Sequence, residues 1–398
     1  MDKSTHRVMC KRVALLVILV CTSASVFTNA PFDQHADAKR MKRHVQRMQQ
    51  VQPGTENSAE TAALIDVDSG RILYEKLGDR RMRIASLTKI ITAWIAVRSP
   101  KFNQTVTVSR NAVRQEGSSV YLAEGEKQTI RNLTYALMLR SGNDSAVAIA
   151  EGVAGSVARF ASMMNADARK VGAQHSHFVN PNGLDHPEHY STANDMALLT
   201  AAALHNPMFR EIVRTKYYSM PWPNQPWDRK MKNKNKLLFM SEADGVKTGY
   251  TKKAGRCLAS SMTKDGHQVA LIVLRDGNDW VDSMRLLRYG LTAFERKPLV
   301  ERFAQTVKIP VRYGVTATVG ARAVGHAIYP LKQDEQRDVR VVVHAVRSLS
   351  APILKNQVAG TVDYVFHGKR IGSAVLKTDN DVKGSGFIGW LRGLFHRS

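Results

Sequence analysis

A serine and a lysine stand three residues apart at the start of an apolar run, Ile84-Ala85-Ser86-Leu87-Thr88-Lys89-Ile90-Ile91-Thr92. The run has a helical pattern, and residues i and i+3 are neighbours on a helix, so the Lys89 ammonium can reach the Ser86 hydroxyl. A serine hydroxyl attacks poorly until a base takes its proton, and a partly buried lysine with a lowered pKa can take it. The spacing therefore indicates a nucleophile with its base, although the same tetrad also arises by chance in a lysine-rich chain.

A second serine lies beside an asparagine in Ser141-Gly142-Asn143. The motif separates a stretch over 129–139 with helical apolar spacing from an alanine-rich helix predicted over 144–152. A short loop between two helices is a rigid place from which both side chains can point at one site. The alternative is structural, because Ser141 or Asn143 could simply cap the second helix.

Lys247-Thr248-Gly249 is the third motif. It precedes two alternating runs, 256–262 and 268–274, which the turn residues 264–267 join as a hairpin, so we expect the motif on a strand paired with that hairpin. Gly249 leaves room for another group to approach the strand backbone closely. A short basic edge strand would give the same pattern, so this motif alone is weak.

The three motifs together are much more specific than any one of them. They occur in the order S-x-x-K, S-x-N and K-T-G, with spacings of about 55 and 105 residues, a set typical of penicillin-binding proteins and class A β-lactamases. At these residues, and in the stretches 177–181 and 189–197, the chain resembles the serine D-alanyl-D-alanine carboxypeptidases (peptidase family S11), the low-molecular-mass penicillin-binding proteins. The resemblance covers roughly residues 60–378 and the tail.

The resemblance implies an α/β (α+β) catalytic domain of the β-lactamase/transpeptidase type with a smaller all-β C-terminal domain. We place the catalytic domain at 58–298, where it opens with a predicted hairpin of strands 61–67 and 71–75. Short alternating runs at 306–311, 339–344 and 358–366 predict the β-rich domain, which we place at 299–380. By resemblance, this domain is a stalk that sets the height of the active site above a membrane.

Carried over to this chain, the resemblance gives each motif residue a role. Ser86 would attack the carbonyl between two D-alanines with Lys89 as general base, and Ser141 would relay a proton to the leaving D-alanine. Asn143 would hold the substrate amide.

The third motif would complete the site. Lys247 would polarise Ser141 and add positive potential, and Thr248 would bind the terminal carboxylate. The backbone N–H groups of Ser86 and Tyr250, the residue after Gly249, would form the oxyanion hole. Tyr250 stands where relatives often have histidine, which leaves that substrate contact open.

The implied substrate is a peptidoglycan peptide ending in D-Ala-D-Ala, with β-lactams as inhibitors that acylate Ser86; no cofactor is expected. An endopeptidase acting on D-alanyl cross-links would use the same residues, and a catalytically weak penicillin-binding scaffold is a further alternative. Efficient β-lactamase activity is disfavoured, because Glu151, Glu188 and Glu211 lack the context of a deacylating glutamate. A zinc peptidase is also disfavoured: the segment 175–189 is rich in His, Asp and Glu but has no metal-binding helical spacing.

The chain carries a strong positive charge. Its 398 residues have a formal net charge of +24, with 58 Lys and Arg against 34 Asp and Glu. Such a balance favours anionic surroundings such as acidic lipid or an anionic cell-wall polymer. Nucleic acid is not an expected partner, because no nucleic-acid-binding signature occurs.

The N-terminus has the pattern of an export signal. Basic residues precede the apolar run 13–20, and small residues follow up to Ala30, so we predict a signal peptide over 1–30, with cleavage after Ala24 as an alternative. Residues 31–57 are polar and basic and predict a linker. With the signal removed, Cys257 is the single remaining cysteine, and its apolar neighbours predict a buried strand thiol.

The sequence pattern predicts an amphipathic helix over the last stretch, 384–398. Phe387, Trp390, Leu391, Leu394 and Phe395 share one face, with arginines opposite, and a dozen residues rise only about 18 Å, too little to span a bilayer. An anchor lying on an anionic membrane surface is expected, at the extracytoplasmic face. The alternative is a terminal helix that docks on the protein itself.

Overall fold

The computed structural model describes residues 54–223, 225–240, 242–304 and 306–386. The signal segment, most of the predicted linker and almost all of the predicted membrane helix therefore lie outside the described residues. Among the described residues, no single helix has both the length and the apolar character needed to cross a membrane; one pair, Asn143–Ala154 with Val157–Lys170, meets these criteria jointly but is bent by 85°.

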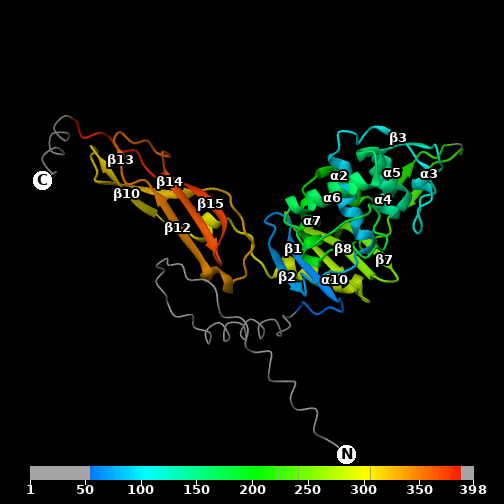
Figure 1. The fold of residues 1–398 in the computed structure, drawn as a ribbon. Coiled ribbons are helices and arrows are strands. Elements are labelled where there is room, and N and C mark those ends of the chain that lie inside the picture. The colour runs from blue at the N-terminus through cyan, green and yellow to red at the C-terminus, as the bar shows by residue number, and fades with distance from the viewer. Residues whose placement is uncertain (1–53, 224, 241, 305, 387–398) are drawn as a thin grey trace, which may run out of the picture. The chain divides into compact units, whose positions relative to one another are not determined.

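A five-stranded antiparallel sheet forms the centre of the catalytic domain (Figure 1). Its order is β2 (Ile72–Lys76), β1 (Thr61–Asp66), β9 (His267–Leu274), β8 (Gly255–Lys264) and β7 (Ala243–Thr251). The predicted hairpin at the start of the domain is β1 with β2, and the predicted pair 256–262 and 268–274 is β8 with β9. Both of these predictions are confirmed.

The sheet separates two apolar cores. Side chains alternate along β1, so that Ala63 and Ile65 belong to one core and Ala62 and Leu64 to the other. The smaller core is closed by α10 (Asp279–Thr292), which packs on β8 and β9. On the opposite face α7 (Ala193–Leu204) packs on β1 and β9, and behind it lie α2 (Lys89–Arg98), α4 (Ile130–Arg140), α5 (Asn143–Ala154) and α6 (Val157–Lys170) (Figure 1).

Short elements surround the larger core. They are β3 (Thr105–Thr107), α3 (Arg110–Val113), β4 (Lys127–Thr129), α8 (Pro207–Arg214), β5 (Tyr217–Met220) and β6 (Arg229–Lys232). The short helix α9 (Leu237–Met240) instead contributes Leu237 to the smaller core. Strands β3 and β4 pair with each other, as do β5 and β6. Cys257 lies on β8 and is 1% exposed, and burial raises the pKa of its thiol to about 11, as expected for a strand thiol in an apolar setting.

The C-terminal domain follows α11 (Leu299–Arg302) and contains a six-stranded sheet. Its order is β12 (Val339–Ala345), β14 (Val358–Phe366), β15 (Lys369–Thr378), β11 (Thr318–Val324), β10 (Thr306–Arg312) and β13 (Leu349–Ser350), and β13 is parallel to β10. The three predicted runs are β10, β12 and β14. The β-rich domain is thus confirmed, whereas β11, β13 and β15 were not predicted.

Candidate active site

Ser86 lies on a short 3-10 turn, η1 (Ala85–Thr88), directly before α2. The sequence predicted a helix starting near Ser86; the regular α-helix begins only at Lys89, whose side chain is fully buried while Ser86 is half-buried. The two residues still face each other as the i, i+3 spacing predicts, with Lys89 Nζ 2.9 Å from Ser86 Oγ.

The Lys89 amine is surrounded by acceptors. Nζ donates to Asn143 Oδ1 and to the carbonyl oxygen of Asn182, both at 2.6 Å. A neutral amine has two hydrogens and one lone pair, so these two acceptors use both hydrogens and the lone pair remains for the hydroxyl proton of Ser86. Burial, together with the nearby charges of Lys247 and Lys234, holds the pKa of Lys89 well below its usual value, although Asp144 acts in the opposite direction.

The S-x-N residues lie between α4 and α5. Ser141 is the C-terminal cap of α4 in the left-handed conformation, with φ of +65°, and is 5% exposed. The N-cap of α5 is Gly142, without a side-chain cap, so the capping alternative does not hold. Asn143 begins α5 and joins two motifs, because its side-chain oxygen accepts from Lys89 while its side-chain nitrogen donates to the carbonyl of Glu116.

The K-T-G motif lies on β7, paired with β8 as the sequence predicted. Gly249 faces the turn η1 that carries Ser86: a Cβ at this glycine would lie 3.3 Å from Ser86 N and 3.2 Å from Ile84 O. Lys247 is 1% exposed and donates to Thr248 O at 2.9 Å, and burial, with Lys234 nearby, lowers its pKa to about 7. Thr248 is half-buried, and the Tyr250 side chain is 66% exposed.

The sequence patterns did not predict several residues that lie around the motifs. Lys234, in the basic stretch after β6, donates to Ser118 Oγ at 3.1 Å and contributes to the lowered pKa values of Lys89 and Lys247. Asn182 supplies its carbonyl to Lys89, and the following residue, Gly183, packs so closely on η1 that a Cβ would lie 2.0 Å from Ala85 O. Only the turn residues Asn182-Gly183 gave a signal in the sequence, and that signal was conformational.

His189 belongs to the segment 175–189, which is rich in His, Asp and Glu and for which a zinc site is the disfavoured alternative. Its imidazole is 4% exposed and accepts from Val179 N at Nδ1 (3.2 Å), which leaves Nε2–H to donate to Thr88 Oγ1 at 2.8 Å. The Thr88 hydroxyl in turn donates to Ala85 O at 2.9 Å. Among the described residues, no cluster of three or more His, Cys, Asp or Glu side chains is arranged to hold a metal ion.

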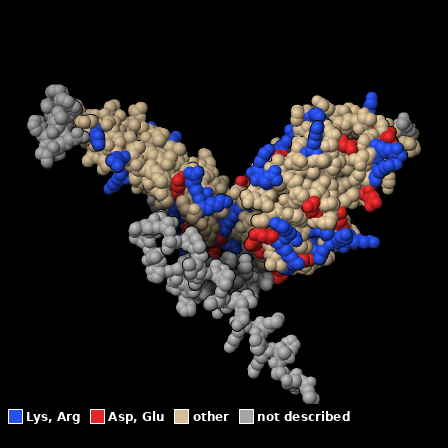
Figure 2. All heavy atoms as spheres, in the orientation of Figure 1, with Lys and Arg blue, Asp and Glu red and all other residues tan. Residues whose placement is uncertain are grey.

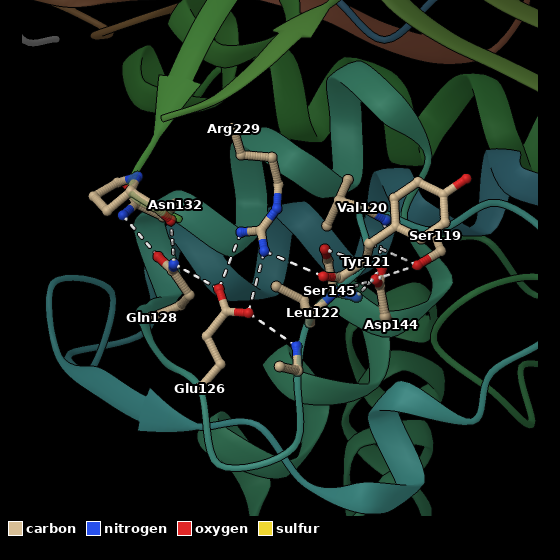
Figure 3. Close-up of polar contacts among 12 residues, drawn as sticks. Ser119, Val120, Tyr121, Leu122, Glu126, Gln128, Asn132, Asp144, Ser145 and Arg229 are labelled. Carbon is tan, nitrogen blue, oxygen red and sulfur yellow. Dashed lines mark hydrogen bonds and ion pairs between the residues drawn. The ribbon is translucent and has the colours of Figure 1, made fainter. Parts of the chain in front are cut away.

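An acidic residue next to Asn143 fixes the neighbouring loop. The buried carboxylate of Asp144 accepts from Ser119 Oγ at 2.6 Å, from Val120 N at 3.0 Å and from Leu122 N at 3.3 Å (Figure 3). The backbone N–H of Asn143 also donates to Ser118 O at 2.7 Å. The loop over 116–122 is thereby held against the start of α5, beside the S-x-N motif.

Comparison with known proteins identifies two family regions in the chain. Residues 46–278 match the D-alanyl-D-alanine carboxypeptidase family, and residues 294–384 match the C-terminal domain of penicillin-binding protein 5. The chain is 34% identical to the D-alanyl-D-alanine carboxypeptidase DacC of Escherichia coli (strain K12), over 82% of this chain and 84% of that protein. It is 30% identical to the D-alanyl-D-alanine carboxypeptidase DacF of Bacillus subtilis (strain 168), over 84% of this chain and 89% of that one.

The fold agrees with these relatives. Crystal structures of penicillin binding protein 5 from Haemophilus influenzae match with a TM-score of 0.64 and 30% identity, covering 84% of this chain and 99% of that one. The family region spans the sheet, the helices behind it and all three motifs. The chain therefore belongs to the D-alanyl-D-alanine carboxypeptidases, a family of peptidases and hence of hydrolases.

Proposed function

We propose that this protein removes the terminal D-alanine from peptidoglycan pentapeptides by a serine mechanism. The observation that carries the proposal is the buried Lys89 amine, whose Nζ lies 2.9 Å from Ser86 Oγ and donates to Asn143 Oδ1 and Asn182 O at 2.6 Å each. Ser86 Oγ bonds to the carbonyl carbon of the penultimate D-alanine as its proton passes to Lys89 Nζ. The carbon–nitrogen bond then breaks and leaves an acyl-enzyme.

The other motif residues bind and complete the reaction in this proposal. Ser141, polarised by Lys247, passes a proton to the nitrogen of the departing D-alanine. Asn143 holds the substrate amide, and Thr248 binds the terminal carboxylate beside the positive potential of Lys247. Water then attacks the ester, and the proton returns to Ser86 Oγ.

The oxyanion hole is proposed to consist of the backbone N–H groups of Ser86 and Tyr250. The close approach of Gly249 to Ser86 N supports it, because the strand edge and the nucleophile turn can then frame one small space. A fixed donor of this kind contributes roughly 3–4 kcal/mol to transition-state stabilisation. β-Lactams would acylate Ser86 through the same groups, and an endopeptidase acting on D-alanyl cross-links would need no others.

The test is D-alanine release from a diacyl-Lys-D-Ala-D-Ala peptide, with penicillin and EDTA as separate additions. We expect the wild type to release D-alanine, penicillin to stop this release and EDTA to leave it unchanged. The Ser86→Ala variant should release no D-alanine. Release that survives Ser86→Ala and is abolished by EDTA would refute the serine mechanism in favour of a metal peptidase.

The protein is proposed to act outside the cytoplasm, at the outer face of the cell membrane. The support is the export pattern of 1–30, the basic composition and the amphipathic pattern of 384–398. Lysines and arginines outnumber aspartates and glutamates in the chain and are spread, with some acidic residues among them, over the face shown in Figure 2, a distribution suited to an anionic wall or lipid surface. Deleting 384–398 should abolish co-sedimentation with anionic liposomes; unchanged binding would remove the anchor from the proposal.

A further inference from the structure

Three aromatic residues, Tyr121, Trp222 and Trp227, lie outside the catalytic motifs on two segments that Arg229 connects, and together they are called the aromatic ledge. Tyr121 is 77% exposed, Trp227 is 59% exposed and Trp222 is half-buried. The two tryptophans line a hollow of about 620 Å³ at the β5–β6 hairpin. Isolated exposed aromatics are common, so the ledge needs evidence that it is a built feature.

A buried ion pair supports the ledge from below. The Arg229 guanidinium contacts Glu126 at 3.0 and 3.2 Å, and the two side chains are only 6% and 2% exposed (Figure 3). The same guanidinium lies 4.7 Å from the Trp222 ring centre and donates to Tyr121 O at 3.2 Å. One buried group therefore fixes two aromatic residues from separate loops.

Gln128 strengthens this support. Its amide nitrogen donates to Glu126 Oε1 at 2.8 Å and to Pro221 O at 2.7 Å, next to Trp222. The second Glu126 oxygen accepts from Ala123 N at 2.9 Å, two residues after Tyr121. A buried ion pair adds little net stability because both charges lose their water. Its contribution here is a fixed geometry for the ledge.

The ledge lies within reach of the reacting bond. Asn143 N donates to Ser118 O, and three residues of chain, at most about 11 Å, separate Ser118 from Tyr121. The four peptide residues before the scissile bond span at most about 14 Å when extended. A substrate peptide with its D-Ala-D-Ala end at Ser86 and its other end running past Ser118 would bring the sugar to which it is attached towards Tyr121.

We propose that the aromatic ledge binds the glycan part of peptidoglycan, the amino-sugar rings that carry the peptide. Pyranose rings present a face of C–H groups that packs on the electron-rich face of an aromatic ring. Ser219, Asp228 and Lys230 line the same hollow and can hydrogen-bond to sugar hydroxyl and acetamido groups. The proposal rests on the proposed function and adds a second point of contact to it.

The test compares two substrates with the same peptide, one free and one linked to its amino-sugar disaccharide. In the full chain, Tyr121→Ala with Trp227→Ala should lower kcat/KM about tenfold for the glycosylated peptide, mainly by raising KM; this corresponds to about 1.4 kcal/mol shared by two stacking contacts. The free peptide should be unaffected. Tyr313→Ala, at another exposed tyrosine in the C-terminal domain, is the matched control and should change neither.

Each other outcome decides a different point. Equal losses on both substrates would mean that the ledge binds the peptide stem, and no loss on either would remove the ledge from substrate binding; both overturn the proposal. Absence of D-alanine release by the wild type from either substrate would instead refute the proposed function. Circular dichroism of the double variant guards against a folding defect.

A separate observation concerns the Ala85–Ser86 peptide bond. The hydrogen-bond relay from His189 through the Thr88 hydroxyl ends on Ala85 O, and Ala85 has φ of +47°, in the left-handed region that few non-glycine residues occupy. In a trans peptide the N–H points opposite to the C=O, so holding Ala85 O also aims Ser86 N–H. We infer that His189 is a positioning residue for this N–H group.

The relay requires a neutral imidazole, because a proton on Nδ1 would oppose the Val179 N–H. Burial and the neighbouring His177, His186, Arg83 and Lys89 lower the pKa of His189 to about 4, which keeps the ring neutral at ordinary pH. Protonation of His189 near pH 4 should therefore disrupt the relay. Other groups of the site could titrate in the same pH range, so variants must isolate the relay.

His189→Phe keeps the ring but loses the donor, and should lower kcat about tenfold with little change in KM. His189→Gln can still donate to Thr88 and should recover most of the loss. Thr88→Val should match His189→Phe, and the double variant should lose no more than either, since all act through one chain of hydrogen bonds. Additive losses in kcat, or a raised KM with kcat unchanged, would overturn the inference.

Discussion

The catalytic and C-terminal domains differ in what they bury. Among the described residues, the catalytic domain encloses lysines, aspartates, histidines and asparagines, with Lys89 and Lys247 almost fully out of water. Among the described residues after 298, Thr378 is the only one outside the hydrophobic types that is buried, and the rest of that core is aliphatic and aromatic. Buried polar groups cost free energy unless they are paired, so their concentration around the three motifs identifies the region shaped for chemistry.

The largest expected effect removes the buried base. Lys89→Met keeps the side-chain length but has no basic nitrogen to take the Ser86 proton, so D-alanine release should fall on the order of 10⁴-fold, at the upper end for a general base. Steady-state kinetics measures the loss. Penicillin acylation of Ser86 should slow in parallel. Activity within tenfold of wild type would contradict the view that the catalytic domain buries Lys89 for chemistry.

The second prediction concerns Lys247 and pH. Its pKa is about 7 in the folded chain and 10.5 when unfolded, so between these values the unfolded chain binds a proton that the folded chain has released. The free energy of unfolding therefore rises with pH across this window, by at most about 1.4 kcal/mol per pH unit for this one group.

Lys247→Met should lack that contribution. Urea unfolding at pH 7.0, 8.0 and 9.0 would show a smaller rise in the variant than in the wild type. The difference between the two reports Lys247 together with its effect on the pKa of Lys89. Lys308→Met, on β10 in the C-terminal domain, is the control. Parallel curves for wild type and Lys247→Met would contradict the burial of a cationic group at this site.

The third prediction addresses the apolar core of the C-terminal domain. Tyr364 is fully buried there, so Tyr364→Ala should lower the free energy of unfolding by about 3–5 kcal/mol, as for other large aromatic truncations. Its kcat/KM for a soluble peptide should stay within twofold of wild type. Strong loss of soluble-peptide activity in a folded variant would show that this core also shapes the active site.

The smallest expected effect uses the same position. The Tyr364 hydroxyl is buried, and no hydrogen-bond partner for it occurs among the described residues. Tyr364→Phe should therefore cost less than about 0.5 kcal/mol, or stabilise the domain slightly, because it removes an unsatisfied polar group. Urea denaturation beside Tyr364→Ala gives the measurement; a loss of several kcal/mol would indicate a partner for the hydroxyl.

Local patterns predicted the parts of the site that lie within one element. The i, i+3 spacing brought Lys89 to Ser86, and alternating hydrophobicity predicted the hairpin with which the K-T-G strand pairs. The contacts of Asn182 with Lys89, of His189 with Thr88 and of Lys234 with Ser118 join residues 93 to 116 positions apart. No local periodicity in the sequence predicts contacts over such separations. In the C-terminal domain, β13 has two residues and β15 contains Gly372, so both are too weakly patterned to be recognised.

The buried thiol on β8 makes this protein suited to site-directed labelling. Cys257 is buried and keeps its proton at neutral pH, so maleimides and thiol-reactive spin labels would not react with it. A cysteine introduced at Trp227 or Tyr121 in a chain without the signal segment would then be the reactive position. A fluorophore placed there would report the arrival of a polymer substrate in real time, before any bond is broken.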